Sequence, residues 1–383
     1  MPPGGNTAPV EVFASRRAHC LLAKGLAGVP PEQAVGVGQC PALLVEQGRI
    51  LALGEDALAA GAPRVHIDAW LSPAPLDAHV HLFLGGTPAR NLAAWRRAGV
   101  VAVRELGRSP RLAGVAMRGA CPPLVMDSGV GLGAKGAGGS WLAWGVAPQV
   151  DEFTRRARQA VARGAGLLKV FVSGLLDFQH PGRVEHALAV DAPCLAAVVS
   201  VARQAGLKVA VHASGEEAVQ AALEAGVDSV EHGFFLSRAT LERMAAQKVA
   251  WVPTLAAVVA HARDPQGRHD RKIRSNLREI VRRQAQRLRW AAELGVGLVL
   301  GSDAGSYGLF HGRALFLEMA AWLEAGVEPH QVWEAATVRA ARLLGLEGKV
   351  GVLAPGARAW LLGTRRDPRR DPLDLARPCW RNF

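Results

Sequence analysis

The sequence has few cysteines, few lysines and no long uninterrupted apolar run. Only seven of its 45 basic residues are lysines. No apolar segment reaches the roughly 18 residues of a membrane span, and residues 1–12 do not resemble a secretory signal. These absences predict a cytoplasmic protein with no membrane partner. The cysteines are scattered without a CxxC pair, which predicts free thiols and neither a disulfide framework nor a zinc knuckle: Cys20, Cys40, Cys121, Cys194 and Cys379.

The net charge of +12 raises the question of a nucleic-acid partner. The densest basic cluster, residues 365–371, is interrupted by aspartate and proline, and a second lies in a helical pattern at 274–289. Neither cluster forms a known binding motif, and solvated arginine faces usually explain such clusters. We therefore expect no nucleic-acid partner.

The central part of the sequence alternates between helical and strand-like patterns. Helical patterns that end in glycine are followed directly by apolar strands, as at 98–103 and 205–211. Glycine just past a helix supplies the left-handed cap that turns the chain back. The repetition predicts an α/β fold, a (β/α)8 TIM barrel. Its eight strands are expected at 76–81, 100–103, 124–126, 167–172, 208–211, 227–230, 249–252 and 296–300.

The two ends of the sequence differ from this central part. We expect residues 1–72 and 347–383 to form together a small β-sandwich domain, and residues 73–346 to form the barrel domain. Strand-like patterns flank Gln47 and Gly48, which is typical of a hairpin turn. Residues 348–351 and 358–362 are also strand-like.

Two histidines at the end of the first barrel strand are the first candidates for a functional site. Successive side chains on a strand point to opposite faces, so His79 and His81 point the same way with only Val80 between them. Two imidazoles on one face can bind one metal ion. Half-buried histidines at a strand end are common, however, so this pattern gains weight only from the residues that end later strands.

Four further polar residues end apolar, strand-like runs: Lys169, His212, His232 and Asp303. In a (β/α)8 barrel the carboxyl ends of the strands carry the chemistry. Each histidine has a structural alternative as a hydrogen-bonded core residue, and Asp303 has one as a helix N-cap. A lysine inside the apolar run 167–172 is harder to explain, because a buried cation without a partner is costly.

As a set, these residues resemble the metal ligands of the amidohydrolase superfamily. The histidine pair follows the first strand, Lys169 the fourth, His212 the fifth, His232 the sixth and Asp303 the eighth. The sequence is most similar to the imidazolonepropionase-like branch, which includes prolidase-type peptidases. The resemblance covers nearly the whole chain, through motifs at 76–81, 103–107, 231–233, 252–255 and 301–305.

This resemblance implies two divalent metal ions, with zinc as the expected metal. His79, His81 and Asp303 would bind one ion, and His212 and His232 the other. The resemblance also implies that Lys169, carboxylated on its amine by carbon dioxide, bridges the two ions, since an ammonium group has no lone pair for a metal. Asp303 would in addition be the catalytic residue that takes up a proton and delivers it to the leaving nitrogen.

The implied activity is hydrolysis of an amide C–N bond, in a dipeptide or N-acyl amino acid with a free carboxylate. Four side chains are candidates for binding that carboxylate, because they are expected after strands four and eight at the end of the barrel that holds the active site: His180, Arg183, Tyr307 and His311. The substrate loops depart from the family pattern. The glycine-rich run at 128–139 lacks a histidine that relatives often carry, and residues 173–177 replace the usual Ser-Gly-Gly.

Two alternatives stay open. One is a mononuclear deaminase or cyclic-amide hydrolase of the same superfamily, in which Lys169 is unmodified. The other is a non-catalytic scaffold or basic binding protein. Metal analysis separates the three, since they bind two ions, one ion or none. The exact substrate, the metal and the oligomeric state, including a homo-oligomer, also stay open.

Overall fold

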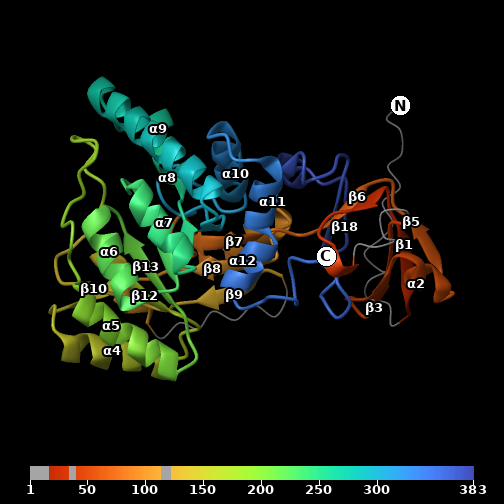
Figure 1. Ribbon diagram of the computed structural model, residues 1–383, viewed down its shortest axis with the longest axis horizontal. Coiled ribbons are helices and arrows are strands. Elements are labelled where there is room, and N and C mark those ends of the chain that lie inside the picture. The colour runs from red at the N-terminus through yellow and green to blue at the C-terminus, as the bar shows by residue number, and fades with distance from the viewer. Residues whose placement is uncertain (1–16, 34–39, 114–121) are drawn as a thin grey trace. The chain divides into compact units, whose positions relative to one another are not determined.

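The computed structural model describes residues 17–33, 40–113 and 122–383 (Figure 1). Contacts divide the chain into two units. One contains the described residues up to Leu76, together with Arg97–Val101 and Pro329–Phe383, and the other contains Asp77–Arg96 and Ala102–Glu328. The domain limits expected from the sequence stay a prediction. No helix among the described residues is long and apolar enough to cross a membrane.

The first unit contains the small β domain. One sheet has the strand order β4 (Arg49–Leu53), β3 (Ala42–Glu46), β1 (His19–Leu22) and β5 (Arg64–His66). The other has the order β18 (Trp380–Arg381), β17 (Leu361–Thr364), β6 (Trp70–Pro73) and β2 (Gly25–Leu26). One apolar cluster draws buried side chains from both sheets, including Leu21, Leu43, Leu71 and Leu361. The shared core makes this a sandwich, as predicted. The unit also holds α2 (Gly54–Ala59), α11 (Pro329–Ala336) and α12 (Val338–Leu343).

Two local predictions in this unit have different outcomes. The hairpin is confirmed: β3 and β4 pair antiparallel, and Gln47 and Gly48 have φ values of 48° and 72°. Both central residues have the positive φ that a type I′ turn requires. The strand expected at 348–351 is wrong, because Gly348 and Gly351 take left-handed φ values of 69° and 74° and break the extended backbone.

The second unit is the barrel, with eight strands near the predicted positions. They are β7 (Leu76–Val80), β8 (Ala102–Glu105), β9 (Leu124–Asp127), β12 (Leu168–Phe171), β13 (Val209–Ala213), β14 (Ser229–His232), β15 (Ala250–Val252) and β16 (Gly297–Leu298). The ladders β7-β8-β9 and β12-β13-β14-β15-β16 follow chain order. The pair β8–β9 and the successive pairs from β12 to β16 are parallel. The backbone of Ala78 donates to Leu300, and Gly166 donates to Asp127, so bonds also join the two ladders. The (β/α)8 prediction is confirmed.

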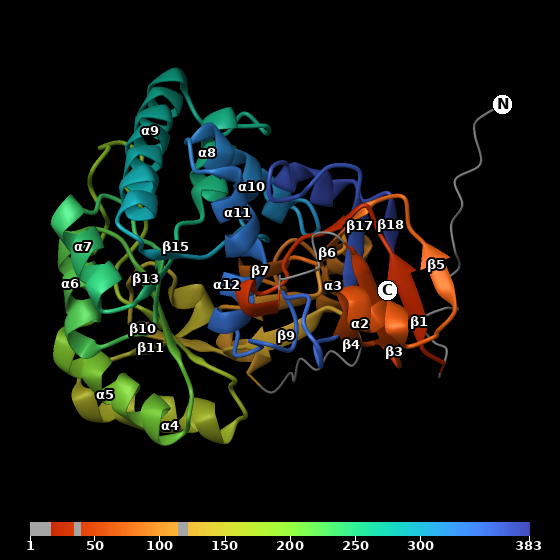
Figure 2. The ribbon, with the colours of Figure 1, turned by 45° about the vertical axis from the view of Figure 1, so that its right-hand side comes forward.

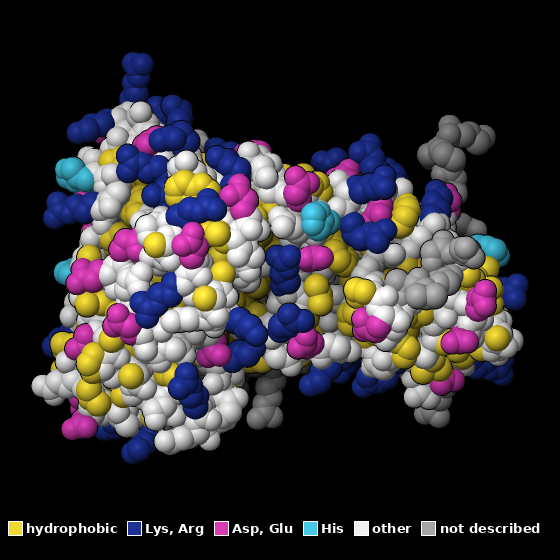
Figure 3. Space-filling model, in the orientation of Figure 1, with side chains coloured by type: hydrophobic (Ala, Val, Ile, Leu, Met, Phe, Trp, Pro, Cys, Tyr) yellow, Lys and Arg dark blue, Asp and Glu magenta, His cyan; other side chains and the backbone are white. Residues whose placement is uncertain are grey.

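Helices surround these strands: α3 (Pro88–Arg97), α4 (Val150–Ala162), α5 (Ala192–Gln204), α6 (Glu216–Ala225), α7 (Arg238–Ala246), α8 (Leu255–Arg263), α9 (Arg271–Glu293) and α10 (Ala314–Glu324). In Figures 1 and 2, α4, α5 and α6 flank the strands β12 and β13 on their outer side. The long α9 contains the predicted Arg-rich segment. Its buried residues recur at helical spacing, from Leu277 and Ile280 to Leu288, so the arginines lie on the remaining surface (Figure 3).

The glycine-rich run after the third strand is not the loop that the sequence suggested. It contains β10 (Gly131–Ala134), which pairs parallel with β12 and with β11 (Ala143–Val146). A Cβ on Gly131 would lie 2.7 Å from the ring of Phe171, and one on Gly139 would lie 2.4 Å from it. The glycines therefore make room for this aromatic side chain, which lines the functional cavity.

The cysteines agree with the prediction where they are described. Cys20, Cys40, Cys194 and Cys379 are free thiols. Cys121 lies outside the described residues.

Candidate metal centre

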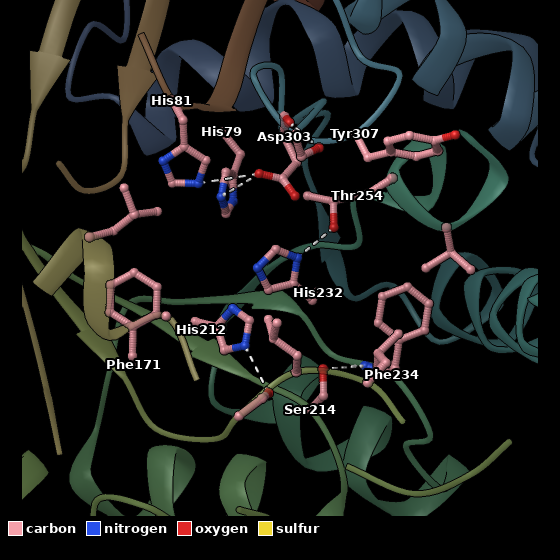
Figure 4. A pocket seen from close by; sticks show the side chains of 18 of the residues that line it. His79, His81, Phe171, His212, Ser214, His232, Phe234, Thr254, Asp303 and Tyr307 are labelled. Carbon is pink, nitrogen blue, oxygen red and sulfur yellow. Dashed lines mark hydrogen bonds and ion pairs between the residues drawn. The ribbon is translucent and has the colours of Figure 1, made fainter. Parts of the chain in front are cut away.

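Three predicted ligands meet at the carboxyl end of the first strand. The Oδ1 atom of Asp303 lies 3.5 Å from Nε2 of His79 and 3.3 Å from Nε2 of His81. One potential ligand atom from each residue lies within 4.8 Å of the others. Figure 4 shows the two imidazoles turned toward the carboxylate. His79 and His81 therefore face the same side of their strand, as expected.

The other two histidines end neighbouring strands, as predicted. The ring centroids of His212 and His232 are 4.4 Å apart, and those of His232 and His79 are 5.0 Å apart. His232 bonds Oγ1 of Thr254 through Nδ1 at 2.7 Å, and His212 bonds the carbonyl of Gly174 through Nε2 at 3.1 Å. One nitrogen of each ring is thus engaged by the protein, and the other remains available to a ligand.

Burial keeps three of the four imidazoles neutral. It lowers the pKa of His79 to about 4 and that of His212 to about 3, and it lowers the pKa of His232 well below its usual range. At His81 burial is outweighed by the hydrogen bond and the charge of Asp303, so the pKa of this imidazole is raised. Neutral imidazole is the form that binds a metal. Burial also acts on Asp303, but the hydrogen bond with His81 and the nearby histidines outweigh it, so the pKa of this carboxyl is lowered and the group is ionised at neutral pH.

Lys169 lies among these residues without a polar partner. It is 1% exposed, and its Nζ atom makes no hydrogen bond with the described residues. The centroid of the Phe171 ring lies 5.2 Å from Nζ. Burial lowers the pKa of Lys169 to about 8, although the carboxylate of Glu231 opposes this shift. Among the described residues, no carboxylate forms an ion pair with this amine.

A buried network that the sequence analysis did not assign supports His79. Glu231 accepts a hydrogen bond from Nδ1 of His79 at 2.9 Å and another from Nη2 of Arg104 at 2.7 Å. Protonating Nδ1 leaves Nε2 as the lone-pair nitrogen on the side of Asp303. Burial alone would raise the pKa of Glu231, but Arg104 and His79 outweigh it and lower the pKa to about 2. The signal was present in the sequence as an arginine and a glutamate inside apolar strands.

Backbone strain is concentrated at the same strand ends. His232, Thr254 and Asp303 have positive φ values of 68°, 46° and 57°. Residues with side chains rarely adopt this region, and they keep it where the surroundings impose it. The carbonyl of His232 accepts hydrogen bonds from Trp251 at 3.0 Å and Gln284 at 2.8 Å. These contacts hold the strand end in the conformation that aims His232 into the cavity.

The cavity above the cluster has a volume of about 430 Å³ and reaches all six predicted ligands. This volume is within the range of small-molecule sites. Apolar side chains make up most of the remaining lining: Leu84, Trp141, Leu142, Phe171, Leu175, Leu176, Phe178, Phe234, Ala257 and Val258.

The four candidates for binding a substrate carboxylate are not brought together. Only Tyr307 lines the cavity. The His180 side chain is 67% exposed and pairs with Asp177 at 2.8 Å, and Arg183 is exposed away from the lining. His311 is buried between Nε1 of Trp95 at 3.1 Å and the carbonyl of Leu84 at 3.0 Å. None of these three lines the cavity, because His180 and Arg183 face solvent and His311 bonds to buried groups of the protein.

The fold and the residues at its strand ends define a barrel hydrolase of the type that acts on C–N bonds. The chain belongs to the amidohydrolase family, which it matches over residues 70–375. An uncharacterized protein of Mycobacterium tuberculosis is 29% identical over 374 residues, which cover 94% of each chain. Ochratoxinase of Aspergillus niger is 24% identical over 236 residues, 60% of this chain and 48% of that one.

A solved structure of an Xaa-Pro dipeptidase with bound methionine has the same fold. Its TM-score is 0.77 at 22% identity, and the match covers 94% of this chain and 96% of that chain. The predicted resemblance to the amidohydrolases and to the fold of prolidase-type members is confirmed.

Proposed function

We propose that this chain is a binuclear metal-dependent hydrolase of amide bonds, with a dipeptide or an N-acyl amino acid as substrate. The main observation that supports this proposal is that four imidazoles, a carboxylate and a buried lysine line the same cavity. The free carboxylate expected on the substrate gains no support, because His180, Arg183 and His311 do not line that cavity.

The residues present fit a pair of metal ions. Nε2 of His79 and Nζ of Lys169 are both buried, and neither makes a hydrogen bond with the described residues. A polar atom buried in this way is costly unless it has a partner. His79, His81 and Asp303 would hold one ion, and His212 and His232 the second. When bound, divalent metal lowers the pKa of water from 15.7 in bulk toward ~7, which makes a nucleophile available at neutral pH.

Lys169 would hold metal only after modification. The neutral form of its buried amine would attack carbon dioxide, form a C–N bond and lose one proton, which yields a carbamate anion. This group offers two oxygens where the ammonium offers no lone pair. The absence of any hydrogen-bonding partner for Nζ among the described residues supports this assignment.

We assign the proton transfer to Asp303. Its Oδ1 atom lies near both His79 and His81. Its second carboxylate oxygen, Oδ2, forms no ion pair with either histidine. That oxygen would accept the proton of the attacking water and return it to the leaving nitrogen, as a general base that becomes a general acid. The leaving amine then departs neutral.

Metal analysis of purified variants tests this proposal. Wild-type protein should bind two zinc ions per chain, and His79→Ala and His232→Ala should each bind fewer while keeping the wild-type circular dichroism spectrum. One ion in the wild type would favour the mononuclear deaminase or cyclic-amide hydrolase, and none would favour the scaffold. Zinc-loaded wild-type protein should also hydrolyse members of a dipeptide and N-acyl amino acid panel, and metal-free protein should not.

A further inference from the structure

The charges that line the cavity do not suit an anionic substrate. Among the described lining residues, only Lys169, Asp303 and Glu185 carry an amine or a carboxyl group. The first two belong to the proposed metal centre. Glu185 is therefore the remaining charge available to a substrate, and it is negative.

Glu185 is held at the cavity by its backbone. Its N–H donates to Leu175 at 2.8 Å, and its carbonyl accepts from Gly174 at 2.9 Å. The bridge between Leu176 and Val184 continues this pairing. The side chain is exposed and makes no hydrogen bond or ion pair with the rest of the described chain. A fixed backbone with an unpaired carboxylate is suited to bind a cation that arrives with the substrate.

Large apolar side chains are exposed at the same cavity. Trp141 is 53% exposed and Leu175 is 41% exposed, and both line it. Deeper in the cavity, Phe171 and Phe234 lie on either side of the histidines (Figure 4). Exposed apolar surface in a cavity favours an apolar ligand, because binding removes that surface from water.

One wall of the cavity is an uncharged aromatic stack. The ring of His261 lies 4.9 Å from that of Phe178 and stacks on Tyr307 at 4.6 Å. Burial and its basic neighbours lower the pKa of His261 to about 4, so this ring is neutral at pH 7. The Tyr307 hydroxyl donates to Asp264 at 2.8 Å, and the Arg268 guanidinium lies 4.5 Å from the centroid of its ring; neither charged residue lines the cavity.

We infer that the substrate carries an aromatic or other large apolar group and an ammonium group that pairs with Glu185. This inference rests on the amide-hydrolase function proposed above and narrows it to amides of apolar amino acids with a free α-amine. The ammonium group donates a charge-assisted hydrogen bond to the Glu185 carboxylate, and the apolar side chain lies against Trp141 and the aromatic stack. A free carboxylate on the substrate is not required.

Four forms of one dipeptide separate these contributions. Phe-Ala is prepared with its N-terminus free or acetylated and with its C-terminus free or amidated, and hydrolysis of the Phe–Ala bond by the zinc-loaded full chain is followed chromatographically. Acetylation should lower kcat/KM by about fivefold, mainly through KM, as expected for a partly exposed charge pair. Amidation should leave kcat/KM unchanged or raise it. Replacing Phe by Gly in the doubly blocked form should lower kcat/KM further.

Two matched variants identify the carboxylate. Glu185→Gln should make the free and acetylated dipeptides equally good substrates, whereas Glu217→Gln, an exposed acid on α6 away from the cavity, should keep the wild-type difference. Equal rates for all four forms in the wild type, or a loss only on amidation, would overturn the inference and leave amide hydrolysis standing. Failure of the zinc-loaded protein to hydrolyse any of the four forms would instead count against the proposed dipeptide hydrolase.

Discussion

The substitution Glu231→Gln tests whether the buried network beneath the metal centre holds His79 in place. Glu231 is 0% exposed, and Arg104 is 2% exposed. Removing one partner of a buried ion pair leaves an uncompensated charge and costs about 3–5 kcal/mol. For a domain of this size that corresponds to a fall in Tm of about 6–20 °C. A glutamine also has an NH2 group in place of one carboxylate oxygen, so either His79 or Arg104 would face a donor where it now has an acceptor.

Calorimetry on metal-depleted protein measures this loss without the contribution of bound metal. The matched control is the double variant Glu231→Leu with Arg104→Met, which removes both charges and should recover much of the stability because no unpaired charge remains. The single variant should also bind zinc less tightly, since Nδ1 of His79 loses the acceptor that fixes its tautomer. A single variant within about 1 kcal/mol of wild type, or a double variant less stable than the single, would show that the network is not organised as a buried pair.

Two further substitutions test other parts of the site, and a third tests Glu318, a buried acid on α10 that accepts a hydrogen bond from the backbone N–H of Leu255. Asp303→Asn should keep bound zinc but lower kcat by at least about a hundredfold, as the loss of a general base does, and a rate near wild type would place proton transfer elsewhere. Lys169→Ala should be inactive and regain part of its activity with zinc and acetate or propionate, and full activity without them would favour the mononuclear alternative. Burial raises the pKa of Glu318 to about 7 from an ordinary 4.5. The folded protein therefore keeps this proton longer than the unfolded chain, and the group lowers stability as pH rises through that window. Denaturation at several pH values should show this pH dependence in the wild type and its loss in Glu318→Gln.

The barrel could be predicted from the sequence because its signals are local. A glycine cap followed by an apolar run marks a helix end and a strand start within a few residues, as at Gly206 and β13 or Gly226 and β14. The same reasoning missed β10, since its glycines resemble a loop until the ring of Phe171 is placed against them. A contact between segments so far apart in the chain leaves no local pattern.

In the candidate site too, local sequence patterns predicted some features, whereas contacts between distant residues were not predictable. The positions of the proposed ligands followed from strand ends. The partner of His79 did not, because Glu231 is 152 residues away in the chain and bonds to Arg104 on yet another strand. The position of His311 outside the cavity was not predictable for a related reason. His311 looks like a loop cation in the sequence, whereas the fold brings Trp95, 216 residues earlier, into hydrogen-bonding distance of its ring.

Closure of the barrel and assembly of the His-His-Asp group depend on the same backbone bonds. The N–H of Asp303 donates to the carbonyl of His79 at 2.8 Å, and the N–H of His81 donates to the carbonyl of Ala304 at 2.8 Å. These bonds join the last strand segment to the first, and they bracket the three side chains that approach one another. A shift of the pairing by one residue would turn His79 and His81 to the other face of their strand. The register that closes the barrel is therefore also the register that places these side chains around one point.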